Sequence, residues 1–175
     1  PRGKTLGGSS SINGLLYIRG QSKDYDIWRQ QGNSGWGWED VLPYFIKSEN
    51  QERGANKFHG VGGPLSVSDI RIKLDILDEF QNAAEEMGIP KIKDFNTGDN
   101  FGCDYFQVTE KNGLRCSTAV AYLNPAKKRS NLKVEVKAHV NKINFEGKKA
   151  IGISYWRDNE LITVKANKEV TLSAG

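Results

Sequence analysis

Two adjacent glycines and three serines near the start of the chain are the residues best suited to hold a ligand. Gly7 and Gly8 lack a Cβ atom, so the backbone there can take positive φ angles and another molecule can approach it closely. The serines at positions 9–11 are candidate N-caps, and a helix start offers unpaired N–H groups to an anion such as a phosphate. We predict that this helix carries its apolar side chains at Ile12, Leu15, Leu16 and Ile18. A simple Gly/Ser linker is disfavoured, because this apolar run follows directly.

Two well-known phosphate loops do not fit this segment. Gly3, Lys4 and Thr5 are similar to the end of a Walker A loop. A helix should begin right after that Lys-Thr pair, and Leu-Gly-Gly is a poor first helical turn. The dinucleotide fingerprint G-x-G-x-x-G is absent from the sequence, together with the first half of a Rossmann fold that would hold it. We therefore reject both loops.

The side chains that could exchange protons do not form a catalytic arrangement. His59 lies in a glycine-rich loop and His139 in a predicted strand, and both are interpreted as structural. The carboxylates of Asp24, Asp26 and Glu39 fit the first turns of helices better than a catalytic pair. The sequence shows neither a nucleophile–base arrangement nor a metal site, so we predict no catalytic residue in this chain.

Composition is typical of a globular domain. The chain has 175 residues, of which 37% are hydrophobic, and this is enough to bury one core. The net charge of +4 is spread along the chain without a basic block, which disfavours nucleic-acid binding. No apolar run approaches the length of a membrane span, and no signal peptide is visible. Cys103 and Cys116 form no C-x-x-C pair, so we expect free thiols in a reducing compartment, with the cytoplasm favoured.

Apolar spacing predicts helices in the first two thirds of the chain. Trp36 and Trp38 are expected to anchor a core. Gly88 supplies a stop for the third helix, and Ser117 caps a fourth that ends before Pro125. The predicted helices span residues 24–31, 38–47, 74–87 and 117–124, with loops over 52–63 and 94–102.

The last third of the chain has the two-residue period of strands. An alternating run over 132–145 contains a slip that indicates a bulge. Further strands are predicted over 105–108, 151–155, 161–164 and 170–172, with turns at 146–147 and 158–159. Three antiparallel strands followed by a short strand that ends in small residues suit a sheet that returns to a nucleotide site. The fold class is therefore α/β, a mixed α+β architecture.

The segment from Gly3 to Asp26 resembles the first signature of the glucose-methanol-choline (GMC) flavoprotein oxidoreductases. It has the Gly-Lys, the Leu-Gly-Gly, the serine pair, Ile12-Asn13, Tyr17 and Gly20 in the family's order and spacing. The resemblance continues through DYDIWRQQG, GWGWEDVLPYFIKSE, FHGVGGPL, LRCSTAVAYLNPA and the closing VTLSAG. Within the family the chain is most similar to the choline dehydrogenase branch.

The resemblance implies FAD as the cofactor and assigns contacts to it. Gly8 and Ser9 match positions that meet the FAD pyrophosphate, and Val140 matches one whose backbone meets the adenine. The stretch beside the isoalloxazine ring corresponds to Asn13, Gly14, Leu15 and Leu16. Ala174 and Gly175 match the start of the segment that leads to the family's second signature. Some members carry at position 12 a histidine that is covalently attached to flavin, so Ile12 predicts no covalent attachment here.

The resemblance also implies a division of the chain. Residues 1–20 contact FAD, residues 21–130 form a helical, substrate-domain portion, and residues 131–175 form the β-meander and return strand of the FAD/NAD(P)-binding domain. The family's G-x-G-x-x-G strand and its catalytic histidine belong to segments outside this chain. We therefore expect a central fragment, whose partner is the remainder of the full-length enzyme.

Two hypotheses follow for the function. The first is a fragment of an FAD-dependent oxidoreductase that oxidises a primary alcohol, choline-like or other, to the aldehyde by hydride transfer. The alternative is a stand-alone, non-catalytic module that binds a nucleotide or a protein partner. Measuring whether flavin is bound by the full-length protein, which contains the missing segments, distinguishes the two hypotheses.

Overall fold

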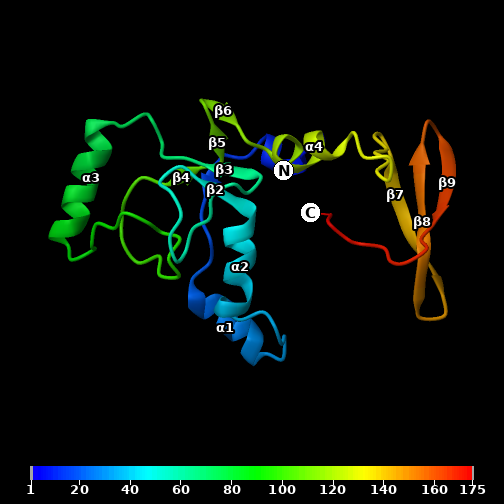
Figure 1. Cartoon of the computed structure of the whole chain (residues 1–175), viewed down its shortest axis with the longest axis horizontal. Coiled ribbons are helices and arrows are strands. Elements are labelled where there is room, and N and C mark those ends of the chain that lie inside the picture. The colour runs from blue at the N-terminus through cyan, green and yellow to red at the C-terminus, as the bar shows by residue number, and fades with distance from the viewer. Residues whose placement is uncertain (1, 175) are drawn as a thin grey trace. The chain divides into compact units, whose positions relative to one another are not determined.

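A computed structural model describes residues 2–174 and divides the chain into two compact units, Pro1–Ala126 and Lys127–Gly175. Both units contain helical turns or strands that are joined by long loops (Figure 1). This mixture of helices and strands confirms the predicted α/β class.

The first unit combines helices with pairs of very short strands. Its helices are α1 (Ser22–Gln30), α2 (Trp38–Ser48) and α3 (Asp75–Glu86), with a 3-10 helix η1 (Gly8–Ser11), a π-helical turn η2 (Ala119–Leu123) and the short α4 (Asn124–Ala126). Antiparallel pairs join β1 (Leu16–Tyr17) to β4 (Gln107–Val108) and β5 (Glu110–Lys111) to β6 (Leu114–Arg115). A parallel pair joins β2 (Glu49–Gln51) to β3 (Leu65–Val67). The β1–β4 pair thus connects the start of the unit to a segment near its end.

Carboxylates fix where α1 and α2 begin. The backbone N–H of Gln21 donates to the Asp24 carboxylate at 2.9 Å, and that of Gly37 donates to Asp40 at 3.0 Å. Asp26 accepts a hydrogen bond from the backbone of Trp38 at 3.2 Å, so it ties α1 to the start of α2. Asp24 and Glu39 therefore lie in the first turns of α1 and α2, as predicted, and Asp40 makes the capping hydrogen bond of α2.

Aromatic side chains pack α1 against α2. The Tyr25 ring lies 5.7 Å from that of Trp38 and 5.8 Å from that of Phe45, measured between centroids. Trp38 is buried, as predicted for a core anchor. The same prediction is wrong for Trp36, which is 53% exposed and packs edge-on against Trp28 at the surface.

Helix α3 forms where its spacing predicts it and ends before Gly88, whose φ of +85° is left-handed. Its apolar stripe is largely uncovered, because Ala84 is the helix's one buried residue. The predicted loops over 52–63 and 94–102 contain no helix or strand.

Two boundaries in the first unit differ from the prediction. Pro125 does not end a helix, because α4 continues directly from η2, and a proline is accepted in the first turn of a helix. Ser117 does accept a hydrogen bond from the Val120 N–H at 3.3 Å, as predicted for a cap. The strand expected over 105–108 shrinks to β4, because only Gln107 and Val108 pair with β1, and the ring of Phe106 stacks on Phe95 with 4.8 Å between the centroids.

The second unit is the predicted antiparallel meander. Strands β7 (His139–Glu146), β8 (Lys149–Arg157) and β9 (Glu160–Lys165) pair in that order. A register shift between Val140 and Lys142 confirms the bulge. Asp158 and Asn159 both have positive φ, which suits the tight hairpin turn between β8 and β9.

Two predicted strands are absent from the described part of this unit. The alternating residues at 132–136 lie outside any strand, because Lys137 has a left-handed φ of +55° that breaks the extended run before β7. Residues 170–172 are also outside any strand, since no described strand pairs with them.

Cys103 and Cys116 are both free, as predicted. Across residues 2–174, no group of histidine, cysteine and carboxylate side chains could hold a metal ion, and no helix could cross a bilayer.

Candidate cofactor-binding site

The predicted phosphate-contacting turn forms, and its backbone suits glycine. Gly7 and Gly8 have φ angles of +87° and +54°, as expected. A Cβ atom added to Gly8 would meet nothing within 4 Å, so this side of the turn is open to an approaching group. On the other side, a Cβ atom on Gly3 would lie 2.2 Å from the Gly8 carbonyl oxygen. The turn is therefore packed against its own chain on one side and open on the other.

The prediction of a helix after this turn is wrong. The 3-10 helix η1 ends at Ser11, and Leu15 has a left-handed φ of +68°. Strand β1 begins at Leu16, whose partner across the ladder is Val108. The backbone N–H of Thr109 also donates to the Leu15 carbonyl at 2.8 Å. Pairing with β4 thus overrides the helical spacing of the apolar residues and makes the segment extended.

The stretch from Asn13 to Leu16 is accessible. Asn13 and Gly14 are exposed, Leu16 is 55% exposed, and Leu15 is half-buried. A Cβ atom added to Gly14 would meet nothing within 4 Å. The segment therefore has room for a planar group beside its backbone.

A buried charge network includes Arg19, which follows β1 in the chain. Arg19 and Glu49 form an ion pair with 3.1 Å between Nη2 and Oε2, and both side chains are almost fully buried. The His59 ring bridges two carboxylates, with Nδ1 at 2.8 Å from Glu49 and Nε2 at 2.8 Å from Asp94. Arg19 also donates to the Phe58 carbonyl at 2.7 Å. Two cations thus face two carboxylates, so the network is balanced in charge.

The network shifts the pKa values of its members. Burial alone would lower the pKa of His59, but its hydrogen bonds and charge interactions with Asp94 and Glu49 raise it to about 9. For Asp94, burial is outweighed by hydrogen bonds from His59 and from the Asn96 backbone, and the pKa is lowered. Burial raises the pKa of Tyr17, whose hydroxyl accepts a hydrogen bond from Arg19 at 3.2 Å, to about 12. His59 is therefore a cation at neutral pH that donates from both nitrogens, as expected for a structural histidine and not for a free base.

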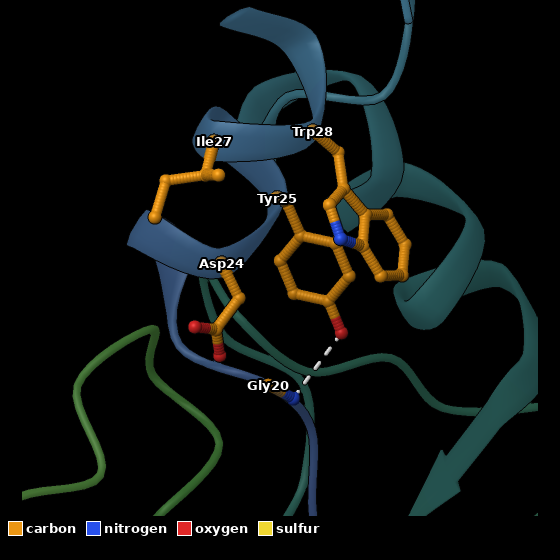
Figure 2. A pocket seen from close by; sticks show the side chains of 5 residues that line it. All are labelled: Gly20, Asp24, Tyr25, Ile27 and Trp28. Atoms are coloured by element: carbon orange, nitrogen blue, oxygen red, sulfur yellow. Dashed lines mark hydrogen bonds between the residues drawn. The ribbon is translucent and has the colours of Figure 1, made fainter. Parts of the chain in front are cut away.

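A pocket of about 380 Å³ lies beside α1 (Figure 2). It is lined by Gly20, Asp24, Tyr25, Ile27 and Trp28. Its polar groups are occupied, because the Gly20 N–H donates to the Tyr25 hydroxyl at 3.2 Å and Asp24 caps α1. None of the predicted cofactor contacts lines it. The pocket therefore does not replace the open turn as the candidate site.

The whole chain matches a known protein family. A family profile described as GMC oxidoreductase matches residues 1–175, which is the whole chain. The chain belongs to the GMC oxidoreductases. This confirms the family that the N-terminal signature predicted.

Curated GMC relatives are similar over the whole chain. The chain is 39% identical to human "Choline dehydrogenase, mitochondrial" and 44% identical to "Oxygen-dependent choline dehydrogenase" of Vibrio vulnificus, with all of this chain covered in both. It is 42% identical to "Alcohol dehydrogenase [acceptor]" of Pseudomonas putida, again over all of this chain. The chain covers 30 to 32% of these relatives, so it spans about a third of their length.

Solved structures confirm the fold. An FAD-dependent oxidoreductase from Chaetomium thermophilum matches with a TM-score of 0.92 and 32% identity, over 99% of this chain and 33% of that one. A pyridoxine 4-oxidase from Mesorbium loti matches with a TM-score of 0.89 and 27% identity, over 95% of this chain and 33% of that one. The family match and the FAD-dependent neighbour support FAD as the cofactor of this GMC chain.

The structure places the predicted GMC site residues in both units. Gly8, Ser9 and the 13–16 stretch lie close along the chain in the first unit. Val140 lies on β7 in the second unit and is 52% exposed. Ala174 is exposed in the same unit, and Gly175 lies outside the described residues. Contact between FAD and each of these positions stays a prediction.

The buried network was not predicted from the sequence, because charged residues in or next to glycine-rich loops are usually exposed. A signal was available, since Arg19, Glu49 and His59 each lie in or beside a segment that carries the family resemblance. Arg115 and Thr118, which contact the glycine turn, were not predicted either.

Proposed function

We propose that this chain is the FAD-contacting part of an oxidoreductase that oxidises a primary alcohol, choline-like or other, to the aldehyde. The observation that carries the proposal is the left-handed turn at Gly7–Gly8, which is open at Gly8 and runs into the accessible 13–16 stretch. The choline and alcohol dehydrogenases among the relatives support an alcohol as the substrate class.

In this proposal the turn and the extended stretch have different tasks. Gly8 and Ser9 meet the pyrophosphate, which can approach because no Cβ atom fills the open side of Gly8. Gly14 leaves space for the substrate carbon, and Asn13 offers an amide to the ring or the substrate. When bound, FAD supplies the ring that accepts the hydride. Ile12 provides no nucleophile, so the flavin is held without a covalent bond.

The remaining contacts come from the second unit and from outside this chain. The Val140 backbone meets the adenine, and Ala174 and Gly175 begin a further cofactor segment. The base that takes the alcohol proton lies outside residues 1–175, since His59 already donates from both ring nitrogens. The matched relatives are about three times as long as this chain, which supports an enzyme of which it forms one part.

The test is anaerobic reduction of flavin in the purified protein that carries this chain. We expect about one FAD per protein, released by denaturation because it is not covalently bound. Choline or another primary alcohol should bleach the flavin absorbance. Tetramethylammonium is the matched control, because it has the cation of choline without the hydroxyl-bearing carbon, and it should leave the spectrum unchanged. Protein that takes up no FAD on reconstitution, or flavin that no primary alcohol bleaches, would contradict the proposal.

A further inference from the structure

The segment after β6 forms hydrogen bonds with the glycine turn. The Thr118 hydroxyl donates to the Gly7 carbonyl at 3.1 Å, and the Ser10 hydroxyl donates to the same carbonyl at 2.5 Å. The Thr118 backbone N–H in turn donates to the Ser10 hydroxyl at 2.9 Å. The two bonds made by Thr118 join the turn to a segment more than 100 residues away in sequence, next to η2, and the two segments lie side by side (Figure 1). The hydrogen bonds fix the carbonyl of Gly7, which immediately precedes the open Gly8.

Arg115 continues this support along the turn. Its Nη1 donates to the Ser10 carbonyl at 3.1 Å and to Oδ1 of Asn13 at 2.8 Å. The backbone N–H of Leu15 donates to the same Oδ1 at 3.1 Å. A charged donor and a backbone donor therefore converge on one side-chain oxygen.

This convergence decides which way the Asn13 amide points. Reversing the amide would place its NH₂ group against two donors, so the oxygen must face Arg115 and Leu15. Within residues 2–174, the Nδ2 group of Asn13 has no hydrogen-bond partner, and the residue is exposed. The amide therefore presents two free N–H donors to whatever lies beside the 13–16 stretch.

We propose that Arg115 is a positioning residue of the flavin site, which acts by holding Asn13 so that its amide N–H donors face the bound ring or the substrate oxygen. The inference rests on the proposed function, because it needs the 13–16 stretch to lie beside the flavin. Loss of Arg115 removes the charged partner of Oδ1 and lets the amide turn. The reduced flavin and the alcohol oxygen carry developing negative charge, so a misdirected donor slows hydride transfer.

The experiment is a double-mutant cycle in the FAD-loaded protein, with Arg115→Met, Asn13→Ala and both together. The readouts are the reduction potential of the bound flavin and the stopped-flow rate of its reduction by alcohol. Each single change is expected to lower the potential and to slow reduction at least tenfold. The double variant should match Asn13→Ala, because in this proposal Arg115 affects the flavin only through Asn13. Arg129→Met, at an exposed arginine of the second unit, is the matched control and should change neither readout.

The outcomes are distinct. Arg115→Lys keeps one cationic donor and should recover most of the potential and rate, and it also serves if the Met variant does not fold. Additive effects in the double variant would mean that the arginine charge acts directly on the flavin, which overturns the inference. An unchanged potential and rate in loaded Arg115→Met protein would also overturn it, while leaving the proposed function intact. Wild-type protein without flavin would instead contradict the proposed function.

Discussion

The buried His59 makes the stability of this protein depend on pH in a predictable way. Its ring is clamped at 2.8 Å from both Glu49 and Asp94, and the ring and the Glu49 carboxylate are almost fully shielded from water. In the folded protein its pKa is about 9, against 6.5 in an unfolded chain. At about 1.4 kcal/mol for each factor of ten, this gap corresponds to roughly 3 kcal/mol of folding free energy.

The sign follows from which state holds the proton. Below pH 6.5 the imidazole is protonated whether the chain is folded or not, so the stabilisation is complete. Between pH 6.5 and about 9 only the folded protein keeps the proton, so the stability falls as the pH rises. Above pH 9 the contribution is gone. We therefore expect wild-type protein to lose about 3 kcal/mol of stability across this window through His59.

The assay is urea unfolding at a series of pH values for wild type and His59→Gln. Glutamine cannot gain a proton. The free energy of unfolding of His59→Gln should therefore be lower than that of wild type at pH 6, and the two curves should converge near pH 9. All other ionisable groups are common to both proteins, so their contributions cancel in the difference. His139→Gln, at the exposed second histidine, should run parallel to wild type. Parallel curves for His59→Gln as well would refute the argument.

Three further substitutions test the site and its support. Gly8→Val should abolish FAD loading while leaving the circular dichroism near that of wild type, whereas Gly147→Val, which has a similar φ of +58° and equally open space, should load FAD normally. Gly14→Leu should keep its FAD, because a Cβ atom there meets nothing, but flavin reduction in stopped flow should slow at least tenfold. An unchanged reduction rate would remove Gly14 from the active site. Arg19→Met should lower the free energy of unfolding in urea by about 3–5 kcal/mol, because it removes one of the two buried cations that pair with Glu49 and leaves the network with an excess negative charge. Arg29→Met, which breaks an exposed pair, should cost less than about 1 kcal/mol.

Elements with a strong local signal could be predicted from the sequence. The carboxylate at Asp24, the stop at Gly88 and the Asp158–Asn159 turn each act within a few residues, and each forms as expected. The helix predicted after η1 failed because β4, far away in the chain, offers the segment a strand partner. A single residue, Lys137 with its left-handed φ, was enough to remove a predicted strand.

The candidate site was predictable only in part. The glycine turn has a local cause, so its positive φ angles could be predicted. The roles of Arg115 and Thr118 depend on long-range contacts that bring them behind the turn, and spacing gives no sign of these. The buried Arg19–Glu49 pair is similar, since burial of these charges depends on partners that are distant in sequence, including His59.

The central claim is that the Gly7–Leu16 segment faces the cofactor, and hydrogen exchange of the protein that carries this chain tests it directly. Backbone amides of the apoprotein are compared with those of the protein reconstituted with FAD. We expect slower exchange on FAD binding in residues 7–16, and an unchanged rate in α3, where no contact is proposed. Equal exchange of residues 7–16 in both forms, in protein that has demonstrably bound FAD, would contradict it.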